Sequence, residues 1–380
     1  MVVEQSLLGK PASPDEVAEA YIYLVKNTDA TGSIVSSNGG PLAATILKGA
    51  FIQATELDDY HSSAPLHSAA VVIPTLLAAV QFPSTSNGRG KSQQRVTGLD
   101  FLIAAVVGFE SGPRAGLALV GPELLTRGWH SGVIFGCPAA ALASARLLVL
   151  SANQTESAVG IACTQAGGLM SATYKGMIKR VQHAFAARAR LFGALPARNG
   201  YVGIRKVFER RYGGFLAMFS QGNGADPPYD VRRVVADLGA RWEVFGIRVK
   251  PHACLGHIVS IPVGLSGPKY AHDGWESFQR PLATTGAQTN VAYSGASQLV
   301  DGQMLLEQFA DRNLDRDEVR VLVQKTSCYY DARFDRPHFG CGARVAVEFD
   351  GGFQVETFLD QPRGYNPRSR TRTSGASFAS

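Results

Sequence analysis

The first side chains that could do chemistry lie in the stretch TELDDYHSSAPLH, which runs from residue 55 to residue 67. It holds three carboxylates and two histidines: Glu56, Asp58, Asp59, His61 and His67. Apolar segments precede and follow the stretch, and charged groups buried between core-forming segments destabilise a fold unless they are paired. Taken alone, the pattern favours a solvated loop between two helices over a buried site of acids and imidazoles.

A second group of candidate residues is cationic. The stretch YKGMIKRVQHAFAAR holds Lys175, Lys179, Arg180, His183 and Arg188. A basic, solvated helix start is the simpler interpretation. The functional alternative is a cradle for carboxylates, because lysine and arginine near a helix N-terminus add their charge to the helix dipole.

Two further stretches contain histidine or lysine. His130 lies in TRGWHSG, where a single histidine beside a tryptophan is more typical of a structural role. In VKPHACLGH, the residues His252, Cys254 and His257 suggest zinc, but no fourth ligand is evident. The better functional interpretation of this stretch is a buried Lys250 at the end of a strand, directed into a cleft.

The sequence lacks the motifs of the common cofactor-dependent and nucleophilic enzymes. No P-loop, dinucleotide-binding GxGxxG, GxSxG or HExxH pattern occurs. The candidate residues instead combine histidines and carboxylates for proton transfer with lysines and arginines for anion binding. This combination, with no cofactor motif beside it, indicates acid–base chemistry on a polycarboxylate.

The elements that must position these residues change character along the chain. Alanine-rich helical patterns cover residues 41–55 and 68–82, and another, LDFLIAAVVGFESGPRAGLAL, begins near Asp100 and meets glycine and proline at Gly112 and Pro113. Beyond Trp242 the pattern alternates, and we expect strands in EVRVLVQKT, ARVAVEFD and FQVETFLD, the last two joined as a hairpin.

The sequence therefore predicts an α+β protein in three parts. Residues 1–244 are expected to form a helical domain with a shortened N-terminus, which includes a helix over residues 14–26. Residues 245–360 are expected to form a smaller α+β domain, and residues 361–380 a disordered basic tail.

Composition limits the class of protein. The chain has 380 residues and a net charge of +6, to which the tail contributes four arginines and no acid, so a nucleic-acid partner is not indicated. The five cysteines form no CxxC pair, as expected of a reducing compartment. The apolar runs 69–80 and 132–145 are too short or too interrupted to span a bilayer, and no signal pattern opens the chain. We therefore expect a cytoplasmic protein with no membrane partner.

Six segments in order carry a resemblance to a known family. They are FIQATELDDYHSSAPLHSA, VGFESGPR, GWHSGVIFGCPAAALA, VGIACTQAGGLMSA, KRVQHAFAAR and RYGGFLAMFSQGNGADPPY. Together they resemble the MmgE/PrpD family, which includes 2-methylcitrate dehydratases and cis-aconitate decarboxylases, and they look most like the fungal decarboxylases. The resemblance is strong over about residues 40–260 and patchy over 260–360.

The resemblance implies a fold, an assembly and a site. It implies a large all-helical domain, a smaller α+β lid domain, a homodimer, and an active site between the domains that needs no metal or cofactor. The catalytic residues that it implies are His67, His130, Lys179, Lys250 and Tyr293. The substrate-binding residues that we expect around them are Glu56, Asp58, Asp59, Tyr60 and Arg180. We expect His67 to face the substrate and His61 to be peripheral.

Three functions are compatible with these residues. The first is decarboxylation of cis-aconitate, or of an alkylated analogue in fungal secondary metabolism, to an itaconate-type product. The alternative is dehydration of 2-methylcitrate or a longer alkylcitrate, a hydro-lyase reaction. A third possibility is an inactive, truncated paralogue, because the segment from His257 to Pro281 is compressed and the chain ends look shortened relative to the family.

Overall fold

The structure is a computed structural model. It describes residues 41–61, 63–80, 96–172, 176–250, 263–265, 282–335, 343–348 and 354–359. The helix predicted over residues 14–26 and the predicted tail, residues 361–380, lie outside the described residues. The domain boundaries predicted at residues 244 and 360 stay predictions.

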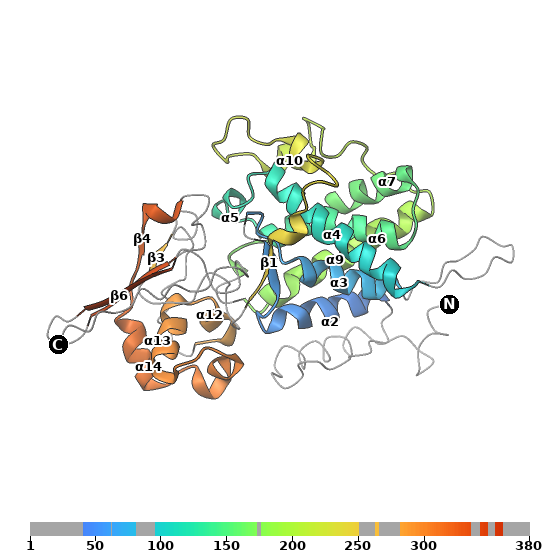
Figure 1. Ribbon diagram of the computed structural model, residues 1–380. Helices are drawn as coiled ribbons and strands as arrows, with labels where there is room; N and C mark the ends of the chain where they lie inside the picture. Colours follow the sequence, from blue (N-terminus) through green and yellow to red (C-terminus); the bar gives the residue numbers. More distant parts are fainter. Residues whose placement is uncertain are drawn as a thin grey trace, which may run out of the picture.

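The N-terminal part of the fold is a bundle of helices (Figure 1). Its longer helices are α2 (Pro41–Ala54), α3 (Ser68–Ala79), α4 (Gly98–Ala118), α6 (Ser131–Leu147), α7 (Ala152–Cys163) and α9 (Lys179–Arg198). Its shorter elements are β1 (Asp59–His61), α5 (Glu123–Thr126), α10 (Phe215–Phe219), η3 (Val231–Val234), η4 (Glu243–Gly246) and β2 (Ile247–Val249). The predicted helices over residues 41–55 and 68–82 are thus confirmed to within a few residues.

Helix α6 lies at the centre of the bundle and packs against α3, α4, α7 and α9. Small residues allow this close approach. A Cβ atom on Gly112 of α4 would come within 2.4 Å of the Leu66 side chain and 2.9 Å of Ala139 in α6. Close packing of this kind fixes the relative positions of helices, because a well-packed core responds to even one added methyl group.

Helix α4 agrees with the predicted helical segment: it runs through Gly112 and Pro113 and ends at Ala118. Its length and apolar composition would allow it to cross a membrane, but 56% of its most apolar window is buried in the fold, as in the core helix of a soluble protein. The buried ion pair between Glu110 and Arg114 lies within the same helix.

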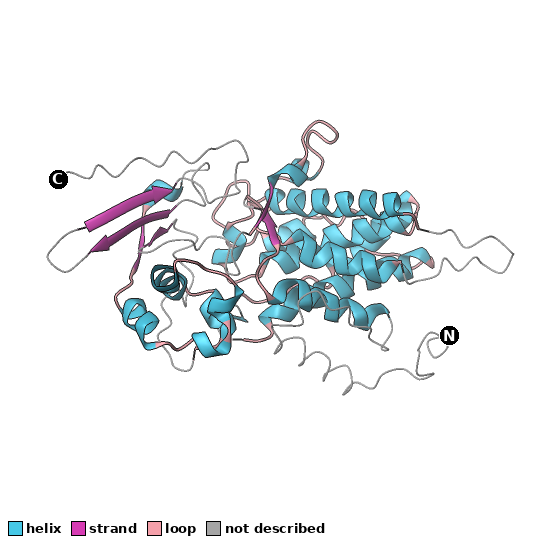
Figure 2. Cartoon of the chain, turned by 60° about the horizontal axis from the view of Figure 1, so that its bottom comes forward, coloured by secondary structure: helices cyan, strands magenta, loops and turns pink. Residues whose placement is uncertain are grey.

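The C-terminal part combines short helices with a small sheet (Figure 2). Its helical elements are α12 (Thr284–Gln288), α13 (Val291–Asp301), η5 (Leu306–Phe309), η6 (Asp311–Asn313), α14 (Asp317–Gln324) and η7 (Ala332–Asp335). Its strands are β3 (Val263–Leu265), β4 (Cys328–Tyr330), β5 (Ala343–Glu348) and β6 (Gln354–Leu359), in the sheet order β4-β3-β5-β6. Helices form the majority and strands are few, in agreement with the predicted α+β class.

Two strand predictions for this part were correct and one was wrong. Strands β5 and β6 pair antiparallel from Ala343 opposite Leu359 to Glu348 opposite Gln354, as a hairpin requires. The segment EVRVLVQKT is not a strand, because its first seven residues lie in helix α14. Its alternating pattern also places Val319 and Val323 four residues apart, and both are fully buried on one face of the helix.

Two sets of contacts bring the segment around β2, at the end of the helical part, against elements nearer its start. Strand β2 pairs antiparallel with β1, with Asp59 opposite Val249. Upstream of β2, Arg114 of α4 donates to the carbonyls of Ala236 and Arg241, at 2.5 and 2.7 Å. The strand pairing and the hydrogen bonds of Arg114 together place Lys250, the residue after β2, beside the acidic stretch that follows α2.

Candidate active site

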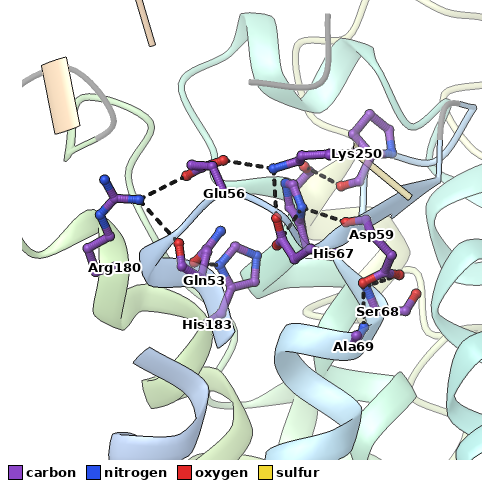
Figure 3. A network of polar contacts seen from close by, with 12 residues as sticks. Gln53, Glu56, Asp59, His67, Ser68, Ala69, Arg180, His183 and Lys250 are labelled. Carbon is purple, nitrogen blue, oxygen red and sulfur yellow. Dashed lines mark hydrogen bonds and ion pairs between the residues drawn. The ribbon is translucent and has the colours of Figure 1, made fainter. Parts of the chain in front are cut away.

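Glu56 is the centre of a buried network of charges (Figure 3). Helix α2 ends at Ala54, and Glu56 turns the chain with a left-handed φ of 54°, which is uncommon for a residue with a side chain. Its carboxylate is fully buried and pairs with three cations. Lys179 forms an ion pair with Oε1, Arg180 Nη1 lies 3.3 Å from Oε1, and Lys250 Nζ lies 2.7 Å from Oε2.

Asp58 extends the network from Lys250 to a histidine. Lys250 Nζ donates to Asp58 Oδ1 at 2.7 Å, and His67 Nδ1 lies 3.0 Å from Asp58 Oδ2. Burial alone would raise the pKa of the Asp58 carboxyl, but Lys250 and His67 together hold that pKa far below its usual range. Asp58 is therefore a permanent anion that holds Lys250 and His67 in place.

Asp59 fixes the start of helix α3. Its two carboxylate oxygens accept hydrogen bonds from the backbone N–H groups of Ser68 and Ala69, at 3.1 and 2.8 Å. Its backbone carbonyl accepts from His67 Nδ1 at 2.8 Å, so that nitrogen carries the proton and Nε2 is the ring atom left for chemistry. Asp59 thus positions His67, and among the described residues no lysine or arginine pairs with its carboxylate.

The pKa of Asp59 leads to a prediction about stability. Burial, and then the neighbouring charge of Asp58, raises this pKa to about 6 from an ordinary value of 3.8. Between pH 4 and pH 6 the native state holds more protons than the unfolded chain, so the free energy of unfolding decreases as the pH rises through this window. A rise of two units in the pKa corresponds to a change of about 3 kcal/mol in the free energy of unfolding across this window.

We expect Asp59→Asn to remove this slope and to leave the loss of stability below pH 4, where Asp58 binds a proton in the unfolded chain but not in the native state. Urea denaturation at half-unit steps of pH measures both regions. An unchanged slope between pH 4 and pH 6 in the variant would show that another group is responsible.

Three imidazole rings meet beside the charged network. The ring of His183, on α9, stands edge-on to His130 at 4.7 Å and to His67 at 5.2 Å between centroids. Burial, and then the charge of His67, lowers the pKa of His130 to about 3. Burial, followed by His130 and His67, also lowers the pKa of His183 well below its ordinary value. His130 and His183 are therefore uncharged at neutral pH.

Arg180 joins the network to the C-terminal part of the chain. Its Nη1 donates to the Gln53 carbonyl at 3.1 Å, and its Nη2 donates to Gln288 Oε1 at the end of α12. Burial lowers the pKa of Arg180 to about 10, so the side chain stays charged at neutral pH. The contact with Gln288 places α12 against the side of the network that carries Arg180.

The structure brings most of the predicted residues together, and the two predicted tyrosines lie in different parts of the fold. Tyr293 lies in the core of the C-terminal helices, where its hydroxyl donates to the carbonyls of Gln308 and Asn313. No contact of its side chain with the charged network is among those described. Tyr60 is buried in β1 opposite Arg248. His61 lies to one side, where its Nε2 is 3.4 Å from Glu243.

Two polar residues of the site were not predicted, and a third, His183, was named only as a member of the cationic stretch. Gln53 and Gln288 carry no charge and stand outside any motif, so their types gave no signal. His183 lies within the basic stretch and four residues after Lys179, which is the spacing that places two side chains on one face of a helix. That spacing could have identified His183 as a residue of the site.

The donor set of the described residues does not suggest a metal site. Across the described ranges, no group of three or more histidine, cysteine, aspartate or glutamate side chains could hold a metal ion. His252, Cys254 and His257, which suggested zinc, lie outside the described residues, as does Lys175.

The arrangement has two chemically different sides. Three cations, Lys179, Arg180 and Lys250, meet the two carboxylates of Glu56 and Asp58 on one side. The uncharged imidazoles of His130 and His183 form the other side, together with His67. Such a site can bind an anion with several carboxylates through its lysines and arginine and can exchange a proton through a histidine.

Comparison with known proteins gives matches along nearly the whole chain. Residues 16–227 match the family model of the MmgE/PrpD N-terminal domain, and residues 245–374 match that of the MmgE/PrpD C-terminal domain. A cis-aconitate decarboxylase-like protein, oryM, of Aspergillus oryzae is 55% identical over 354 residues, which cover 86% of this chain and 73% of the relative.

Two relatives are named cis-aconitate decarboxylase. The protein of Aspergillus terreus is 46% identical over 354 residues, which cover 86% of this chain and 71% of the relative. The human protein is 24% identical over 310 residues, which cover 76% of this chain and 62% of the relative.

Proposed function

Because the chain belongs to the MmgE/PrpD family, we propose that it is a carboxy-lyase that decarboxylates cis-aconitate or an alkylated cis-aconitate to an itaconate-type product. The observation that carries this proposal is the convergence of Lys179, Arg180 and Lys250 on two buried carboxylates, beside three imidazoles. The names of the Aspergillus relatives support the same reaction and substrate class. A reaction that needs no cofactor is part of the proposal.

The chemistry requires an anion site and a proton donor. Cis-aconitate has a carboxylate on a methylene carbon next to a C=C bond. When the bond to that carboxylate breaks, CO2 leaves and its electron pair forms a new C=C bond to the central carbon. The original double bond shifts, and the far vinyl carbon takes up one proton. One proton is therefore consumed for each CO2 released.

The two sides of the site are suited to these two requirements. The carboxylates that remain in the product are held by the cations Lys179, Lys250 and Arg180, which the Glu56 carboxylate keeps in one place. His67 is the proposed proton donor, because Asp58 and the Asp59 carbonyl fix its Nδ1 and leave Nε2 to exchange a proton. His130, with a pKa of about 3, is not an imidazolium at neutral pH and has no second proton to give.

The direct test is a product analysis of the purified full-length chain. We expect cis-aconitate to yield CO2 and itaconate in equal amounts, with one proton taken up per turnover in a pH-stat. In D2O the product should carry one deuterium at the carbon that was the far vinyl carbon. Incubation with 2-methylcitrate is the comparison, and dehydration of that substrate without CO2 release from cis-aconitate would overturn the proposal. The predicted homodimer and cytoplasmic location stay predictions.

A further inference from the structure

His183 has contacts that a structural histidine does not need. It is fully buried on α9, and its Nδ1 meets Gln53 Oε1 at the end of α2. An amide oxygen only accepts, so Nδ1 carries the proton and Nε2 is a bare acceptor. That Nε2 has no hydrogen-bond partner among the described residues, and neither has the buried Nδ1 of His130.

The start of α6 is shaped to receive this ring. A Cβ atom on Gly132 would lie 2.2 Å from His183 Nε2, so only glycine leaves room for the imidazole. His130 directly precedes α6, and its ring meets the His183 ring at an interplanar angle of 83°. The contact between the two rings therefore restrains the orientation of both at the first turn of α6.

The charges around His183 favour a neutral ring. The titratable groups that act on it are His130 before α6, His67 before α3, Lys179 on its own helix, and Asp58. Of these only Asp58 favours an imidazolium, whereas burial, the two histidines and Lys179 all oppose it. Gln53 adds no charge, and an amide at this position accepts a hydrogen bond without attracting a second proton to the ring.

We propose that His183 is a positioning residue, which fixes the ring of His130 and, through Gln53, keeps these two imidazoles free of positive charge. The proposal rests on the proposed decarboxylation. A leaving carboxylate loses its charge as CO2 departs, so a neighbouring cation would stabilise the ground state more than the transition state. Cations hold the retained carboxylates on the opposite side, and the neutral rings of His130 and His183 face the carboxylate that leaves.

Two variants separate the ring from the hydrogen bond. His183→Asn keeps an N–H donor toward Gln53 but removes the ring, and we expect kcat to fall about 10²-fold, the effect of a small displacement at a reacting centre, with little change in KM. Gln53→Glu places a carboxylate against Nδ1–H, which raises the pKa of His183. For this variant we expect kcat to fall about tenfold per pH unit below the new pKa.

Gln154→Glu, in the capping box of α7, is the matched control for Gln53→Glu and should keep the wild-type dependence of kcat on pH.

Ring spectra test the same proposal without turnover. In long-range 1H–15N spectra of histidine-labelled protein, the signal that His183→Asn removes should show a protonated Nδ1 and no titration between pH 5 and pH 8. The same signal should titrate in Gln53→Glu, and His183→Asn should shift the signals of His130. A wild-type His183 that titrates or carries its proton on Nε2, or unchanged kcat and His130 signals in a folded His183→Asn, would overturn the proposal. Failure of the proposed function would differ, because the wild type would then not decarboxylate cis-aconitate while the ring spectra kept their expected form.

Discussion

Replacement of Glu56 by glutamine is expected to lower the free energy of unfolding by about 3–5 kcal/mol, the usual effect of removing one partner from a buried ion pair. Glu56 is fully buried, and its carboxylate contacts Lys179, Arg180 and Lys250. Glutamine has the same shape but no charge, so three cations would then share the single carboxylate of Asp58. We also expect a large loss of kcat/KM, because the cations would no longer be held in one arrangement.

The measurements for Glu56→Gln are urea denaturation and cis-aconitate turnover at the same pH. Glu156→Gln is the matched control, because Glu156 pairs with Arg205 at the surface, where both side chains are more than a third exposed. An exposed pair of this kind contributes little, so the control should leave stability and activity nearly unchanged. Glu56→Asp keeps the charge and should retain most of the stability. Equal behaviour of Glu56→Gln and the control would show that Glu56 does not organise the network.

The charged network was predicted from the family resemblance and not from its residue types alone. Glu56, Asp58, Lys179 and Lys250 lie far apart in the sequence, and the family resemblance joined them into one site. The ion pairs of the structure bring the same four together. Composition alone favoured a solvated loop for the acidic stretch. A short sequence does not show which distant cations will pair with its carboxylates and offset the free-energy cost of burying them.

The elements and residues that were missed depend on tertiary contacts. The segment EVRVLVQKT alternates as a strand would, but the burial of Val319 and Val323 on one face fits helix α14. Gln53 became part of the site only through its contacts with His183 and Arg180. Tyr293, expected in the site from the resemblance, has its hydroxyl engaged with backbone carbonyls in the C-terminal core. Such contacts join distant segments and leave no periodic pattern in the sequence.

Replacement of His67 by asparagine is expected to lower kcat by about 10²–10⁴-fold, the range typical of a positioned proton donor. The asparagine amide can occupy the place of Nδ1 and keep the hydrogen bonds to Asp58 and the Asp59 carbonyl. It has no equivalent of Nε2, which we propose as the atom that gives the proton to the far vinyl carbon. The loss should therefore fall on kcat, and KM should change much less, because the cations that hold the substrate are untouched.

His61→Asn is the matched control for His67→Asn, because both histidines belong to the same stretch of chain. His61 Nδ1 accepts from the Ala64 N–H at 3.1 Å, which an asparagine oxygen can also do, and its Nε2 faces Glu243 outside the network. We expect this control to keep kcat. Added imidazole should restore part of the activity of His67→Asn, since a small donor can enter the space that the ring has left. If His67→Asn retains the wild-type kcat with its fold intact, the proton comes from another group. The low pKa of His130 would then point away from that residue as well and toward Lys179 or Lys250, which contact the same Glu56 carboxylate.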